Sequence, residues 1–228
     1  MKYLVFLLLI LFACNKSELS PYDKFKMECM DALKFISLMP PSTNYCKGTI
    51  NNEAFYWSDA TQSFKPYVST ITIVNGTSAG HVRYAFGLVD TNYFKGYPHP
   101  PDFSILLGFN LDKYVNISTA IDETIKLGRL NFSQNSNDRL GDFFVVMPVS
   151  CGRESPLGGS DTMWSSTVGS QTDSYIECTK IDKQELADSV KYNLTFKFSL
   201  NIYTDVYGEK LWNRLEDCEL NIGFLVNK

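Results

Sequence analysis

The stretch "KYNLTFKFSLNIYT", residues 191–204, decides the fold of this 228-residue chain. Apolar side chains stand at every second position, and polar residues separate them: Leu194, Phe196, Phe198, Leu200 and Ile202. A period of two is that of a β-strand, whose successive side chains point to opposite faces, and not that of a helix. We therefore predict a strand with one buried face and one face in water.

Similar β patterns, separated by turn residues, recur along the chain. We expect two short strands within 45–57, joined at the turn pair Asn51-Asn52, and further strands at 67–74, 81–90, 103–109, 142–149, 174–181 and 218–226. Residues 116–127 have room for a short helix. About nine such strands predict a mainly β domain over 45–228, an antiparallel β-sandwich with a β-barrel as the alternative.

A helix is predicted before this β-rich domain, over residues 23–41. Phe25, Cys29, Leu33 and Ile36 follow one another in steps of three and four, which gives one apolar helical face. The prolines at 40 and 41 end the pattern. We expect this N-terminal helix to pack against the β domain, with binding of a partner by the same face as the alternative.

The first residues carry the signs of a targeting segment. Lys2 is followed by ten apolar residues, Tyr3 to Phe12, which is half of the roughly 20 that a membrane-spanning helix needs. A charged start and a short apolar run are typical of a cleaved signal. We therefore predict that residues 1–13 are a signal peptide, with an ordinary secretory peptide as the alternative to the lipoprotein type described next.

Leu11-Phe12-Ala13-Cys14 resembles the lipobox of bacterial lipoproteins. The resemblance implies that Cys14 is acylated, with palmitate among the chains, and that the chain is cut before it; residues 14–22 then form the lipidated cysteine and a tether. Burial of acyl groups contributes about 0.8 kcal/mol per methylene, so several chains hold a protein on a membrane. Asn15 in place of Asp implies the outer membrane, while the periplasmic and surface faces both stay open.

A second resemblance covers most of residues 45–226. The segments that carry it are Gly48 to Asn52 with Phe55 and Trp57, then Ile176, Thr179 and Asp182, then Thr195 to Phe198. In this order they resemble small uncharacterised lipoproteins of Bacteroidota-type bacteria, although Asn52, Leu194 and Cys218 stand where glycine is usual. The resemblance implies a β-sandwich-like lipoprotein and carries no catalytic residue with it.

Five cysteines remain once Cys14 is assigned to lipid: Cys29, Cys46, Cys151, Cys178 and Cys218. An envelope location permits disulfides, and the candidates are a Cys29–Cys46 bridge and a bridge between two of Cys151, Cys178 and Cys218. An odd number leaves at least one thiol, and buried free thiols are the alternative to either bridge. The sequence leaves the pairing open. It contains no CxxC spacing, so we expect no zinc site of the usual kind.

Composition narrows the function classes. The net charge of −4, without any basic run, argues against nucleic acid as a partner. Two histidines, and the lack of a nucleophile elbow, a zinc-protease motif or a phosphate-binding loop, give no catalytic set. We expect no metal and no cofactor.

Candidate ligand-binding residues lie in "NYFKGYPHPP", residues 92–101. Tyr93, Phe94, Tyr97 and His99 are presented on a segment stiffened by prolines, which suits stacking on sugar rings or on a partner's apolar patch. Trp164 is a further candidate, within the long polar segment 151–174. The alternative is that these aromatic side chains fold back over the domain.

These observations predict a lipid-anchored envelope protein, attached to the membrane through its N-terminal lipid. We expect a non-enzymatic binding or surface-structural module whose ligand is a glycan or a protein. The alternative is an envelope hydrolase of the glycosidase kind, which needs two carboxylates about 5 to 9.5 Å apart in a cleft.

Overall fold

The computed structural model describes residues 43–60, 64–73, 81–90, 103–110, 116–131, 143–149, 162–166, 169–206 and 209–228. The predicted signal peptide, Cys14, the tether and the helix at 23–41 lie outside these residues. The elements are β1 (Tyr45–Ile50), β2 (Glu53–Ser58), β3 (Phe64–Ile73), β4 (His81–Asp90), β5 (Phe103–Asn110), α3 (Ile117–Thr124), β6 (Gly128–Arg129), β7 (Phe143–Val149), β8 (Thr162–Ser165), β9 (Tyr175–Glu185), β10 (Ser189–Val206) and β11 (Glu209–Asn227).

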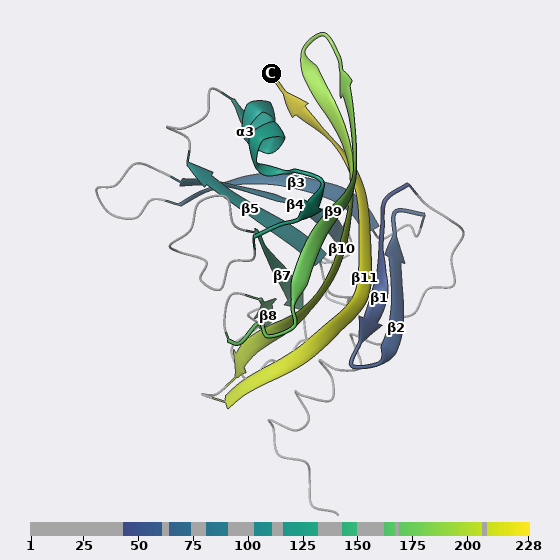
Figure 1. Cartoon of the computed structure of the whole chain (residues 1–228), viewed down its shortest axis with the longest axis vertical. Coiled ribbons are helices and arrows are strands. Elements are labelled where there is room, and N and C mark those ends of the chain that lie inside the picture. Colours follow the sequence, from purple (N-terminus) through teal and green to yellow (C-terminus); the bar gives the residue numbers. More distant parts are fainter. Residues whose placement is uncertain are drawn as a thin grey trace, which may run out of the picture.

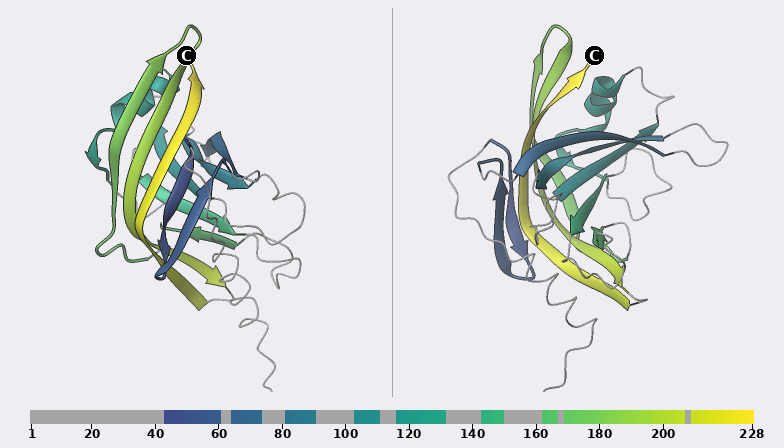
Figure 2. Two further views of the ribbon diagram at one scale, coloured as in Figure 1. Left: turned by 90° about the vertical axis from the view of Figure 1, so that its right-hand side faces the viewer. Right: turned by 180° about the vertical axis from the view of Figure 1, so that it is seen from behind.

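All described strands belong to one antiparallel sheet, which confirms the predicted mainly β class. Its order is β2-β1-β11-β10-β8-β7-β5-β4-β3, with β9 paired to β10 and β6 paired to β9. Figure 1 shows that β3, β4 and β5 run across the direction of β9, β10 and β11, and Figure 2 shows the same crossing from behind. The two layers that face each other are thus halves of one folded sheet.

The core lies where these two halves meet, on the inner face of β10. All five alternating apolar residues of the deciding stretch are fully buried, as predicted. The ring of Phe196 in β10 lies with its centroid 5.7 Å from that of Phe86 in β4 and 6.3 Å from that of Phe143 in β7. Phe86 also stacks on Phe224 of β11 at 5.2 Å. Aromatic side chains therefore join the crossing halves of the sheet.

A β-bulge bends the long β10–β11 hairpin. Phe198 pairs with Cys218 and Leu200 pairs with Leu215, so that Ser199 alone faces two residues of β11. One of them, Asp217, has a φ of 49° and donates its backbone N–H to the Ser199 hydroxyl at 3.1 Å. A bulge increases the local twist and bends the strand that carries it. The Ser199 hydroxyl thus accepts a backbone N–H that has no partner in the interrupted strand pairing.

Three cysteines fall within the described residues, and all three are buried free thiols: Cys46, Cys178 and Cys218. Burial raises the pKa of Cys46 well above its ordinary value and that of Cys178 to about 11. Because the thiolate is the reactive form, these residues act as small apolar side chains of the core. Cys29 and Cys151 lie outside the described residues.

The short helix expected within 116–127 forms as α3. The Asn116 side chain caps it by accepting the backbone N–H of Thr119 at 2.9 Å. Tyr192 of β10 holds α3 against the sheet, because its buried hydroxyl donates to Asp122 Oδ1 at 3.0 Å. Lys183 of β9 pairs with the same carboxylate at 2.6 Å. Polar contacts thus fix α3 on β9 and β10.

Two of the sequence predictions are corrected by the structure. Residues 162–165 form β8 rather than part of a polar loop, because they pair with Val146–Val149 of β7 and, at Ser165, with β10. Trp164 therefore lies on a strand, opposite Met147. The last strand begins at Glu209 and not at 218, since it pairs with β10 along its whole length despite its charged residues.

Candidate functional site

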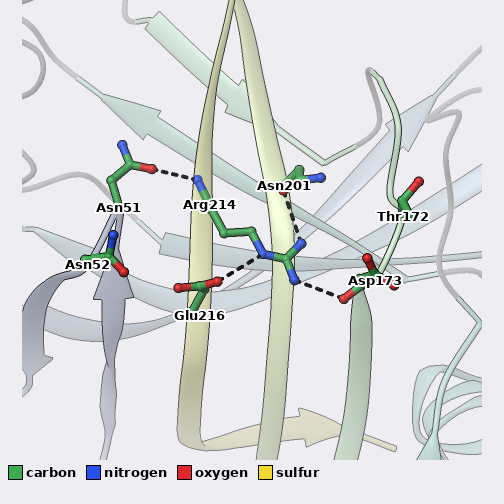
Figure 3. Close-up of a pocket in the computed structure, with 7 residues that line it drawn as sticks. All are labelled: Asn51, Asn52, Thr172, Asp173, Asn201, Arg214 and Glu216. Carbon is green, nitrogen blue, oxygen red and sulfur yellow. Dashed lines mark hydrogen bonds and ion pairs between the residues drawn. The ribbon is translucent and has the colours of Figure 1, made fainter.

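An open hollow of about 540 Å³ lies on the face of β10 and β11 that is turned away from the core. We call it the Arg214 hollow after its central residue (Figure 3). Arg214 points outward because its neighbours Asn213 and Leu215 are buried on the inner face. The residues that line the hollow are Asn51, Asn52, Thr172, Asp173, Asn201, Arg214 and Glu216.

The Arg214 guanidinium is held from three sides. Its Nη1 donates to Asn201 Oδ1 at 3.2 Å and to Ser174 Oγ at 3.3 Å, and its Nη2 donates to the Asp173 carbonyl at 3.0 Å. Its Nε lies 3.6 Å from Glu216 Oε1. The Arg214 side chain is only 21% exposed, and its hydrogen bonds connect the segments that surround the hollow.

The first wall is the turn between β1 and β2. Asn51 and Asn52 have φ values of 50° and 68°, the left-handed pair that a tight two-residue hairpin requires and that was expected at these residues. Asn51 N donates to the Arg214 carbonyl at 3.0 Å, and Asn51 Oδ1 accepts from Arg214 N at 2.9 Å. These bonds continue the β1–β11 pairing past the end of β1 and place Asn52 at the rim.

The second wall is the segment 169–174, which leads into β9. The buried side chain of Gln171 fixes it, because its amide accepts from Asn201 N at 3.1 Å and donates to the Asn201 carbonyl at 2.8 Å. The Ser170 carbonyl accepts the Tyr203 hydroxyl at 2.6 Å. The Gln171 side chain thus bonds to the backbone of β10 as a neighbouring strand would. These bonds set the position of Thr172 and Asp173.

Backbone strain is concentrated at this place. Of the described residues other than glycine, four have a positive φ: Asn51, Asn52, Asp173 and Asp217. The first three line the hollow, and the fourth follows Glu216, which also lines it. Left-handed conformations are costly for residues with a Cβ, though least so for Asn and Asp, and they gather at binding sites.

The hollow offers hydrogen-bonding groups and a small negative charge. Asp173 and Glu216 outweigh Arg214, so its formal charge is −1. Among the described residues, neither the Asn52 amide nor the Asp173 carboxylate has a hydrogen-bond partner, so both can receive a ligand. An amide both donates and accepts, and a carboxylate accepts. The arrangement suits a ligand that donates several hydrogen bonds, such as one with neighbouring hydroxyl groups.

None of the ligand-binding residues predicted from the sequence is among the described residues that line this hollow. Tyr93, Phe94, Tyr97 and His99 lie outside the described residues, and Trp164 is on β8. Sequence reasoning identified Asn51-Asn52 only as a turn, and it did not single out Asp173, Asn201 or Arg214. These residues lie far apart in the chain and form no motif. The only available signal was the length of the polar segment 151–174, which includes Asp173, since long loops are often functional.

Similarity to known proteins assigns no activity to this chain. No model of a protein family, no curated protein and no solved structure matches the chain. Within the described parts of the chain, no three His, Cys, Asp or Glu side chains lie together as a metal site would need. No helix among the described residues is long and apolar enough to cross a membrane.

Proposed function

We propose that this is a lipid-anchored protein of the bacterial envelope that binds a polar ligand, glycan or protein, in the Arg214 hollow without transforming it. One observation carries the proposal. Hydrogen-bonding side chains from four separate segments meet around one guanidinium, and two of them, those of Asn52 and Asp173, have no partner among the described residues. The lipid anchor is inferred from the lipobox resemblance at Cys14.

Pre-organisation supports a binding role. Asn51 and Gln171 fix both walls through the backbone of β10 and β11 before any ligand arrives. Binding then costs the conformational entropy of the ligand but little conformational entropy of the protein, which favours affinity. The hollow is open rather than enclosed, so part of a long ligand, such as a chain of sugars or a surface loop, fits it better than a small molecule.

A hydrolase remains the second candidate because two carboxylates, Asp173 and Glu216, line the same hollow. Glycosidases use such a pair on either side of the bond that they cleave. In the present hollow, Arg214 stands between the two acids and makes contact with the side chain of Glu216 and the backbone of Asp173 (Figure 3). We favour binding because Arg214 occupies the space in which the scissile bond would have to lie.

Two variants test the hollow without disturbing the fold. Asn52→Gly suits a φ of 68°, and Asp173→Asn keeps a residue type that tolerates a φ of 58°. We expect full-length protein in detergent to bind at least one member of an oligosaccharide array or a peptide library, and each variant to weaken that binding about tenfold while the unfolding temperature stays unchanged. Tenfold corresponds to about 1.4 kcal/mol, the size of one good hydrogen bond.

Lys191→Ala is the matched control, because this exposed residue lies on the same face of β10 but away from the hollow. It should bind as the unmodified protein does. If both site variants also bind normally, the hollow is not the site. Cleavage of an oligosaccharide that Asp173→Asn abolishes would replace the binding proposal with the hydrolase.

The anchor has a separate test. Cys14→Ser removes the only sulfur that the lipobox resemblance assigns to acylation, so cells fed with labelled palmitate should label the native protein and not the variant. Cys46→Ser, a change at a buried core thiol, serves as the control that should keep its label. Equal labelling of native protein and Cys14→Ser would remove the envelope anchor from the proposal.

A further inference from the structure

A pair of stacked tyrosines lies on the same outward face as the Arg214 hollow. The rings of Tyr45 in β1 and Tyr56 in β2 are 5.9 Å apart between centroids and nearly parallel, at 17°. Both side chains are half-buried, so each keeps part of its ring in solvent. Side chains turned inward from the same hairpin, those of Phe55 and Trp57, belong to the core instead.

Neighbouring charges hold Tyr45 in place. Its hydroxyl donates to the Glu219 carboxylate, Lys47 Nζ lies 3.2 Å from that carboxylate, and the same Nζ lies 5.4 Å from the centroid of the Tyr45 ring. Burial and the hydrogen bond to Glu219 raise the pKa of Tyr45 well above its ordinary value, so the hydroxyl stays a donor. The pair is rigid, and a ligand that stacks on it has little side-chain freedom to remove.

The pairing of the strands places the tyrosines and the hollow along one line. In β1, Lys47 is opposite Tyr56 of β2, and Thr49 is opposite Glu216, which lines the hollow. Tyr45 and Thr49 are four residues apart, or about 13 Å along a strand. The described outward side chains between them are Lys47, Thr49, Glu216 and Glu219, which are polar, and the small Ala54 opposite Thr49. A ligand that reaches both places must be longer than a single small ring.

The charge and the polarity of this face indicate which class of polymer it binds. The formal charge of −1 in the hollow disfavours phosphates and acidic sugars. A protein partner needs a central cluster of apolar or aromatic anchors with an apolar core around them, and the described side chains between the tyrosines and the hollow are polar apart from the small Ala54. Sugar rings fit better, because their apolar faces stack on aromatic rings while their hydroxyl groups bond to amides and carboxylates.

From this combination we infer that the ligand is a neutral oligosaccharide that runs along β1, with one sugar on the Tyr45–Tyr56 pair and another in the Arg214 hollow. The inference rests on the proposed binding function and adds the ligand class and a second subsite. Asn52 and Asp173 receive hydroxyl groups in the hollow. Tyr56 supplies the apolar contact at the other end.

Binding of full-length protein in detergent to three sets of probes tests the inference: neutral oligosaccharides of two to eight sugars, acidic oligosaccharides, and a peptide library. We expect binding of neutral oligosaccharides that weakens about tenfold in Tyr56→Ala and stays within twofold in Tyr56→Phe. The phenylalanine variant keeps the ring, and the loss measured in the alanine variant is thus due to stacking. A shorter neutral sugar that reaches only the hollow should bind equally to native protein and Tyr56→Ala.

The possible outcomes separate a failure of this inference alone from a failure of the proposed function. Binding of acidic oligosaccharides or peptides alone would contradict the inference and leave the binding function in place. Binding of neutral oligosaccharides that is unchanged in Tyr56→Ala, in protein with unchanged unfolding temperature, would contradict the second subsite. If no probe binds, the inference and the proposed function both fail.

Discussion

Phe196→Ala is expected to lower the free energy of unfolding by about 3–5 kcal/mol, the range measured when a buried phenylalanine is cut back to alanine. Phe196 lies on β10, is fully buried, and makes ring contacts with Phe86 of β4 and Phe143 of β7. Its removal leaves a cavity between the crossing halves of the sheet. Neither half can close the cavity alone, because each is held by its own ladder of backbone hydrogen bonds.

Urea unfolding followed by fluorescence of the native tryptophans measures this effect. Lys197→Ala is the matched control: it changes the next residue on the opposite, exposed face and should stay within about 0.5 kcal/mol of the unmodified protein. Phe196→Leu should fall between the two, since it keeps part of the buried volume. A loss below 1 kcal/mol for Phe196→Ala would mean that the two halves do not depend on this contact.

The strand of Phe196 is also the part of the fold that the sequence predicted best. Strict alternation identifies β10 because its inner face is apolar at every second residue, and one buried face gives that pattern directly. β11 pairs with β10 over the same length, yet the buried polar residue Asn213 and the extra residue of the bulge interrupt its alternation, and only its second half was predicted. β6 has two residues, too few to show any period.

The Arg214 hollow was beyond sequence reasoning for a different reason. Asn52, Asp173, Asn201 and Arg214 meet only because β1 and β10 both pair with β11, and because Gln171 fixes the segment before β9 to β10. Such neighbours depend on strand order, which an alternating pattern does not encode. The turn at Asn51-Asn52 was predictable because its chemistry is local, since two successive residues must tolerate a positive φ.

Gly48 is the second position at which a single substitution should have a large effect. A Cβ at this position would lie 2.4 Å from Cys218 Sγ, 2.9 Å from Cys218 Cα and 3.0 Å from the Glu216 carbonyl oxygen. β1 passes this close because its pairing with β11 shifts at the same bulge that faces Ser199. We expect Gly48→Ala to cost about 2–3 kcal/mol of unfolding free energy, the upper part of the range for overpacked sites.

Two further variants separate the causes of that loss. Gly128→Ala is the control for backbone conformation alone, because Gly128 has a φ of 100° but nothing within 4 Å of an added Cβ; it should cost about 1 kcal/mol. Cys218→Ala removes the sulfur but leaves the Cα and the carbonyl oxygen, so we expect it to recover about 1 kcal/mol of the Gly48→Ala loss in a double-mutant cycle.

If Gly48→Ala costs no more than Gly128→Ala, then β1 does not press against the bulge. Since that bulge also sets the position of Glu216, the same variant should weaken any ligand held in the Arg214 hollow, and Gly128→Ala should not.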